Sequence, residues 1–139
     1  MTRLRNLFWL FLLMMGLAAC GGGGETFTGD DVVAAFKAAG LEAEDPYIMT
    51  KDDYGLAPFV GTGTRFFLPS LCDDCGGRII ITDNNEDTEA IREYYVTLGE
   101  TSAAFFSWVT VRDNVVLQMN GDLPEESFHQ YETVLNGMD

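Results

Sequence analysis

Cys72 and Cys75 form a CxxC pair, the sharpest chemical signal in the sequence. Such a pair can close a local disulfide, act as a redox couple or supply two ligands to a metal ion. Redox chemistry needs a stabilised thiolate, whereas Asp73 and Asp74 lie between the two sulfurs and disfavour it. The pair also lies between predicted strands and does not open a helix. We therefore expect a structural disulfide, with inert thiols, a metal site and redox catalysis as the alternatives.

A metal site would need ligands beyond the two sulfurs. For zinc they would have to come from His129 or from carboxylates, because the sequence has no second CxxC and no other histidine. Residues 83–87 resemble the start of a calcium-binding loop, but Thr88 and Tyr94 replace its glycine and its final glutamate. This spacing excludes an EF-hand and fits a turn followed by a helix cap. We expect no metal and no cofactor, with calcium at an irregular acidic site as the alternative.

The residue types give little support to hydrolytic chemistry. His129 is the only histidine, and none of the serines occupies a G-x-S-x-G elbow. Asp and Glu together number 22, so that no chosen carboxylate pair is informative. We expect a non-catalytic domain, and a small envelope hydrolase that uses carboxylates is the enzymatic alternative.

Aromatic residues supply the candidate binding patch. Phe106 and Trp108 fall on one face of a predicted strand and Ser107 falls on the other, because side chains alternate along a strand. Core packing is the default role of such residues. If one face of the sheet is uncovered, Trp108 beside Gln118 can form a half-apolar surface that binds a partner. Phe106, Trp108 and Tyr54, the last in a long loop, make up the predicted patch.

The first 20 residues carry an export signal. Arg3 and Arg5 precede an apolar run at 7–16, and small residues precede Cys20. The run is too short to cross a bilayer, which takes about 20 residues. Leu17-Ala18-Ala19-Cys20 resembles the lipobox of bacterial lipoprotein precursors. This resemblance implies cleavage before Cys20 and transfer of a diacylglyceryl group to its thiol, and the alternative is an ordinary secretory leader with Cys20 left free.

Acylation at Cys20 would hold the protein at a membrane. Each buried methylene contributes about 0.8 kcal/mol, so that two or three acyl chains on one residue anchor it stably. We expect a signal peptide at 1–19, a lipidated cysteine with a glycine-rich tether at 20–27, and one domain at 28–139. The expected location is the extracytoplasmic side of a cell membrane or outer membrane. The expected partners are the lipid bilayer and a protein of the cell envelope.

Length, charge and hydropathy limit what the domain can be. The chain has 139 residues, which is room for one ordinary domain. Its formal net charge of −14 repels phosphates, and this excludes nucleic-acid binding. Hydrophobic residues make up 47% of the chain and aromatic residues 12%, too many for a disordered acidic tail. We expect a compact acidic domain.

Three helices are predicted from apolar periodicity and end signals. The signals are Thr28 and Gly40 for the first helix, residues 83–87 and Gly99 for the second, and Pro124 and Gly137 for the third. Each helix has an apolar stripe, and each stripe needs a partner surface.

Two hairpins are predicted between the helices. Residues 65–71 and 78–82 flank the cysteine loop, and residues 108–112 and 115–120 flank Asp113-Asn114, a two-residue loop suited to a primed turn. The order is helix, hairpin, helix, hairpin, helix. It predicts an α+β fold with a four-stranded antiparallel sheet, three helices mainly on one face, and the other face freer for water or a partner.

Residues 42–63 are long for a connection between a helix and a strand. They contain Pro46 and Pro58 and place Asp52-Asp53-Tyr54-Gly55 between apolar residues. We expect a covering segment that packs its aromatic residues over a sheet edge or the core, and a functional loop is the alternative.

Three segments of the mature chain resemble a family of small exported bacterial domains, some of them labelled stress proteins or lipoproteins. They are 49–58 (MTKDDYGLAP), 66–71 (FFLPSL) and 120–126 (NGDLPEE) after a valine-rich hairpin. The resemblance implies no established activity or catalytic residues. The sequence thus predicts a membrane-anchored extracytoplasmic lipoprotein that acts by binding. A thiol- or metal-handling envelope protein built on Cys72 and Cys75 is the alternative beside the hydrolase.

Overall fold

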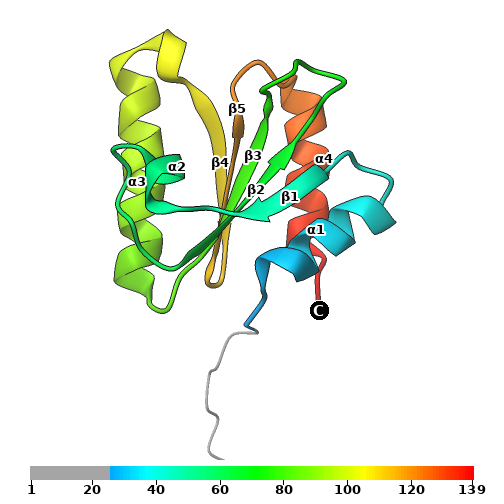
Figure 1. Ribbon diagram of the computed structural model, residues 1–139, viewed down its shortest axis with the longest axis horizontal. Helices are drawn as coiled ribbons and strands as arrows, with labels where there is room; N and C mark the ends of the chain where they lie inside the picture. The colour runs from blue at the N-terminus through cyan, green and yellow to red at the C-terminus, as the bar shows by residue number, and fades with distance from the viewer. Residues whose placement is uncertain (1–25) are drawn as a thin grey trace, which may run out of the picture.

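A computed structural model of the chain describes residues 26–139. The strands are β1 (Glu44–Ile48), β2 (Thr62–Phe67), β3 (Gly76–Ile81), β4 (Ser107–Arg112) and β5 (Val115–Asn120), and the helices are α1 (Gly29–Ala38), α2 (Lys51–Tyr54), α3 (Asn85–Thr101) and α4 (Glu125–Asn136), with a 3₁₀ turn, η1 (Ala103–Phe105). The strands form one antiparallel sheet of five, in the order β1-β2-β3-β5-β4 (Figure 1). The predicted α+β class is confirmed.

The structure contains the three predicted helices and both predicted hairpins, and it adds β1 and α2 within residues 42–63. All five residues of the edge strand β1 are exposed, and its pairing with β2 is irregular between Glu44 and Tyr47. Asp45, with φ of 47°, lies in this irregularity. An exposed, irregular strand shows no apolar alternation, and the four residues of α2 make about one turn, so that neither leaves a periodic signal in the sequence.

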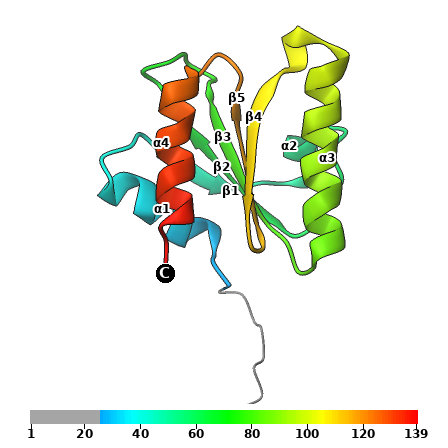
Figure 2. The ribbon, with the colours of Figure 1, turned by 180° about the vertical axis from the view of Figure 1, so that it is seen from behind.

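Helices cover both faces of the sheet, which corrects the expectation that they lie mainly on one face. α1 and α4 pack against one face and α3 against the other, with the sheet between them (Figures 1 and 2). The reason lies in the central strands. Ile79 and Ile80 on β3, like Val115 and Val116 on β5, are successive buried residues that point to opposite faces.

The larger core lies between the sheet and helices α1 and α4. Phe36 of α1, Phe66 of β2 and Tyr131 of α4 meet there, and the ring centroids of Phe36 and Tyr131 are 5.0 Å apart. Full burial of one Phe side chain contributes about 1.5–3 kcal/mol. This layer is the scaffold that holds the central strands in place.

The smaller core lies under α3. Ile91 and Tyr95 of α3 pack with Ile80 and Val116 of the sheet, and Tyr54 at the end of α2 joins the same cluster. Residues 42–63 therefore pack Tyr54 over the smaller core, which is what the sequence predicts for a covering segment.

Side-chain caps fix where the helices begin. Thr28 Oγ1 accepts a hydrogen bond from the backbone nitrogen of Asp31 at 3.2 Å, and the Asp31 carboxylate accepts one from the backbone nitrogen of Thr28 at 2.8 Å. Asn84 Oδ1 accepts a hydrogen bond from the backbone nitrogen of Asp87 at 2.9 Å. The residues that resemble a calcium loop thus cap α3, and such a cap contributes about 1 kcal/mol.

Candidate functional site

A cavity of about 300 Å³ opens on the face of the sheet that α3 covers. Strands β3 and β5 form its floor, α3 with η1 forms one wall, and the residues at the end of α2 form another. We call this cavity the α3 groove. Its lining includes Tyr54, Leu56, Arg78, Phe106, Ser107 and Gln118. The volume falls at the lower end of the range of small-molecule sites.

Arg78 and Gln118 make the floor of the α3 groove polar. They are opposite each other on the paired strands β3 and β5, and Arg78 Nη1 donates a hydrogen bond to Gln118 Oε1 at 2.9 Å. Gln118 is 5% exposed and Arg78 is half-buried. Strand alternation puts them on the same face as Ile80 and Val116 of the smaller core. The fold therefore holds a cation beside an apolar layer.

Two polar atoms of groove residues are buried without a hydrogen-bond partner in the described part of the chain. They are Nε of Arg78 and Oγ of Ser107. Buried polar groups are normally paired, and leaving one unpaired costs about 1–3 kcal/mol. The protein itself thus uses only part of the hydrogen-bonding capacity at this floor.

Arg65 lies directly opposite Arg78 in the β2–β3 ladder. Its Nη2 donates a hydrogen bond to the carbonyl oxygen of Asp74 at 2.8 Å, and its guanidinium carbon is 5.3 Å from the ring centroid of Phe67. Burial and, after it, the charge of Arg78 lower the pKa of Arg65. Within residues 26–139, neither arginine forms an ion pair.

Exposed apolar side chains form the rim of the α3 groove. Leu56 is 92% exposed, Phe105 56% and Phe106 43%, and all three line the cavity. A single exposed apolar residue is ordinary, but three around one cavity next to a polar floor give an amphipathic site. Burial raises the pKa of Tyr54 and of Tyr95, which both line the groove.

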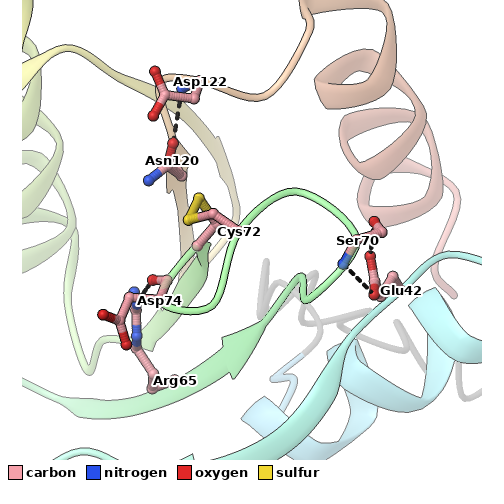
Figure 3. Close-up of a disulfide and its surroundings, with 8 residues drawn as sticks. Glu42, Arg65, Ser70, Cys72, Asp74, Asn120 and Asp122 are labelled. Atoms are coloured by element: carbon pink, nitrogen blue, oxygen red, sulfur yellow. Dashed lines mark hydrogen bonds between the residues drawn. A yellow bond between two sulfur atoms is a disulfide. The ribbon is translucent and has the colours of Figure 1, made fainter.

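The cysteine pair closes the loop between β2 and β3 (Figure 3). The sulfurs of Cys72 and Cys75 are 2.06 Å apart, which is disulfide distance. Within this loop the carbonyl oxygen of Asp74 accepts the hydrogen bond from Arg65. In the described part of the chain, no group of three or more His, Cys, Asp or Glu residues is arranged to hold a metal ion. The hydrogen bond between Arg65 and Asp74 shows that the loop closed by the disulfide helps to position the Arg65 side chain.

The structure divides the predicted patch between two places. Phe106 and Tyr54 both line the α3 groove, Phe106 from the position after η1 and Tyr54 from the end of α2. Trp108 does not line it, although its ring centroid is 4.9 Å from that of Phe106. Tyr54 is 4% exposed, so that it contributes to the wall and not to the rim.

Trp108 packs on the opposite face of the sheet. Its ring stacks on Phe128 of α4 with centroids 5.3 Å apart, and its Nε1 donates a hydrogen bond to the carbonyl oxygen of Leu123 at 2.8 Å. Trp108 pairs with Met119 in the β4–β5 ladder. Trp108 and Gln118 therefore lie on opposite faces, which corrects the expectation that they share one surface.

Other polar residues considered from the sequence lie in structural contacts. His129 is exposed on α4, with Nδ1 3.0 Å from a carboxylate oxygen of Glu132. Glu42 accepts a hydrogen bond from the backbone nitrogen of Ser70 at 3.0 Å, which joins the segment after α1 to the segment after β2 (Figure 3). The carbonyl oxygen of Glu42 accepts a hydrogen bond from the Tyr131 hydroxyl at 2.7 Å.

The predicted signal peptide, the lipobox and Cys20 lie outside the described residues. Among helices of residues 26–139, none combines the length and the apolar character that crossing a membrane requires.

Arg78 and Ser107 are groove residues that were not among the predicted site residues. A signal for Arg78 was present, because it is two residues before Ile80 in a predicted strand, and alternation sends both side chains to one face. A charge on the same face as a core isoleucine is unusual unless it has a partner or a role. Alternation also gives the strand face of Ser107, but its place beside β5 depends on the pairing register of β4.

Comparison of the chain with protein-family models, with curated proteins and with solved structures found no match. The resemblance of residues 49–58, 66–71 and 120–126 to small exported bacterial domains stays a prediction.

Proposed function

We propose that the chain is a membrane-anchored extracytoplasmic lipoprotein whose domain binds a small molecule in the α3 groove. One observation carries this proposal: exposed Leu56 and Phe106 surround a floor where the Arg78 guanidinium donates one hydrogen bond, from Nη1 to Gln118, and has further Nη hydrogens for a ligand. Small-molecule sites have this composition, mostly apolar with a few placed polar groups that orient the ligand.

The floor of the α3 groove is suited to a preformed site. β3 pairs with β2 and β5, and β5 pairs with β3 and β4, so that both floor strands are held on two sides. α3 is fixed to the same strands through buried Ile91 and Tyr95. A ligand that enters a rigid floor loses little free energy to the ordering of the protein.

The anchor supports the same function through location. Cleavage and acylation at Cys20 would leave a short connection to the domain, because α1 begins at Gly29. A ligand site on a domain attached in this way stays close to the bilayer, where it can capture or present molecules of the cell envelope.

A fragment screen on the full chain tests the proposal. The protein is produced in a bacterium, extracted with detergent and titrated with anionic, neutral and cationic fragments, and the binding site is mapped by hydrogen exchange. We expect protection of the amides in β3, β5 and η1. Leu56→Ala should weaken binding, whereas Ile48→Ala should not, since Ile48 is also exposed, at 60%, but does not line the groove. Fragments that protect only α1 and α4, or no bound fragment, would contradict the proposal.

A further inference from the structure

We infer that the ligand of the α3 groove is a small carboxylic acid with an apolar body, and that Arg78 binds its carboxylate. The inference rests on the proposed function, because it names the chemical class of ligand for the same groove. The juxtaposition that carries it is a half-buried arginine without a carboxylate partner below an exposed apolar rim.

Arg78 forms no ion pair within the described residues, and the Asp53 carboxylate of the same groove, which interacts with its charge, is hydrogen-bonded to Thr50. Lys37, Arg92 and Arg112 each form an ion pair with a carboxylate, whereas Arg78 forms none in residues 26–139. Burying a charge without a partner is costly. The sequence has 22 acidic residues and only 8 Lys and Arg residues, so that carboxylates are not scarce. Arg65 is also without an ion pair but does not line the α3 groove, whereas Arg78 does, so that an anion in the groove can reach Arg78.

The donors at the floor fit a carboxylate. A guanidinium presents a planar fork that binds both oxygens of a carboxylate. Arg78 Nη1 donates one hydrogen bond to Gln118 Oε1 at 2.9 Å. This bond fixes the orientation of the guanidinium and leaves its other N–H groups for an anion. Ser107 lines the same groove, and its buried hydroxyl has no partner in the described region.

The charges around the groove favour a monoanion over a dianion. Asp53 also lines the groove, and hydrogen bonds from Thr50 and, after them, the charge of Arg78 lower its pKa. Arg65 is directly opposite Arg78 but donates to the carbonyl oxygen of Asp74. With a formal net charge of −14 on the chain, a phosphate dianion is repelled more strongly than a singly charged carboxylate.

The exposed rim residues are expected to contact the apolar part of the ligand. Leu56 on one side and Phe105 with Phe106 on the other lie at the mouth of the groove and are exposed. A ligand that covers them removes apolar surface from water. The cavity of about 300 Å³ has room for an aromatic ring on a short chain, which is the size of molecule that small pockets take.

A matched pair of probes tests the inference on the full chain. 3-Phenylpropanoate and 3-phenylpropanamide have nearly the same shape and differ in charge, and each is titrated by calorimetry at pH 7, with inorganic phosphate as a third probe. We expect the acid to bind at least about tenfold more tightly than the amide, because hydrogen bonds to charged groups are the stronger ones. Arg78→Gln should lower the affinity for the acid at least about tenfold and leave the amide unchanged.

Two further variants make the result independent of how well Arg78→Gln folds. Arg92→Gln removes an exposed, ion-paired arginine of α3 and should leave both affinities unchanged. Leu56→Glu alters a side chain that is 92% exposed, so that folding is preserved, and places a negative charge at the rim. Both probes should bind more weakly than to the unaltered chain because the apolar contact with Leu56 is lost, and the acid should lose more affinity than the amide because of the added negative charge.

The other possible results separate the carboxylate assignment from the proposed binding function. Equal affinities for acid and amide in the groove, or tighter binding of phosphate than of the acid, overturn the carboxylate assignment and leave the proposed binding function standing. Acid binding that is unaffected by Arg78→Gln, or binding of neither probe, also overturns the inference. The proposed function itself fails only if the full fragment panel finds no ligand of any charge in the groove.

Discussion

Arg65 of β2 and Arg78 of β3 lie directly opposite each other, so that two like charges share one face of the sheet in an acidic protein. Like charges in this position destabilise an antiparallel ladder. Each guanidinium has its own acceptor, the Asp74 carbonyl oxygen for Arg65 and the Gln118 amide oxygen for Arg78. The fold thus keeps a cation at the floor of the α3 groove at a cost in stability, a conflict that is typical of functional sites.

The pair of Arg78 and Gln118 gives a prediction about stability. Gln118→Leu alone leaves the half-buried guanidinium without its acceptor and should lower the free energy of unfolding by about 1–3 kcal/mol. Arg78→Met combined with Gln118→Leu replaces both partners by apolar side chains and also removes the opposition to Arg65. We expect this double variant to be at least as stable as the unaltered chain in urea unfolding. A double variant less stable than Gln118→Leu would show that Arg78 stabilises the fold.

Two glycines are predicted to respond to alanine in opposite directions. A Cβ on Gly77 would lie 2.4 Å from Cζ of Phe66, which is fully buried and has no room to move, so that Gly77→Ala should destabilise the fold by about 1–3 kcal/mol. A Cβ on Gly99, within α3, meets nothing closer than 3.4 Å. Gly99→Ala should therefore stabilise the fold by up to about 1 kcal/mol through helix propensity. Denaturant unfolding measures both, and equal effects would contradict the packing around Gly77.

Reduction of the Cys72–Cys75 bond should lower stability and loosen the loop that holds Arg65. A loop this short contributes about 2 kcal/mol in the chain-entropy model, enough to detect but too little to unfold the domain. Urea unfolding with and without a reductant gives the loss. A Cys72→Ser/Cys75→Ser variant should show the same stability in both conditions. A reductant effect that persists in that variant would contradict the assignment to this pair.

The sequence predicted the elements that bury a regular apolar stripe and missed those that do not. α1, α3 and α4 each combine a stripe with end signals, and both hairpins combine strand residues with turn residues. β1 is exposed along its length and α2 makes about one turn, so that no period revealed them. The two-sided burial of the sheet was predictable in principle from the unbroken apolar runs at 79–81 and 115–117, which are typical of strands covered on both faces.

The α3 groove depends on a pairing that local sequence does not contain. β3 lies beside β5 and not beside β4, so that Arg78 faces Gln118, forty residues away in the chain. A local pattern shows which face a side chain takes, but it does not show which strand lies next to it. The sequence predicts Phe106 and Tyr54 as members of one binding patch, but their common place around one cavity follows from the tertiary arrangement of α2 and η1.

Tyr131 predicts a loss of stability at high pH. Burial raises its pKa from 10.0 to about 12, and its hydroxyl donates a hydrogen bond to the carbonyl oxygen of Glu42. A group whose pKa is higher in the folded state contributes its full stability below the unfolded pKa and loses it as the pH rises through the folded one, here between 10 and 12. Urea unfolding at pH 9 and pH 11.5 measures the loss. Tyr131→Phe should lose less stability than the unaltered chain between these two pH values. The loss that remains is due to other tyrosines, such as Tyr54 and Tyr95, because burial also raises their pKa.

Acylation of Cys20 is predicted from the resemblance of Leu17-Ala18-Ala19-Cys20 to a lipobox, and intact mass measures it directly. We expect the full chain, produced in a bacterium and extracted from its membranes, to start at Cys20 and to carry the added mass of a diacylglyceryl group. Cys20→Ser should lose that mass, because serine has no thiol to accept the group. Cys72→Ser is the matched control, since it also removes one cysteine but lies in the loop between β2 and β3, and it should keep the lipid. A chain that remains unprocessed and carries no lipid would overturn the anchor and, with it, the reason to place the α3 groove beside a membrane.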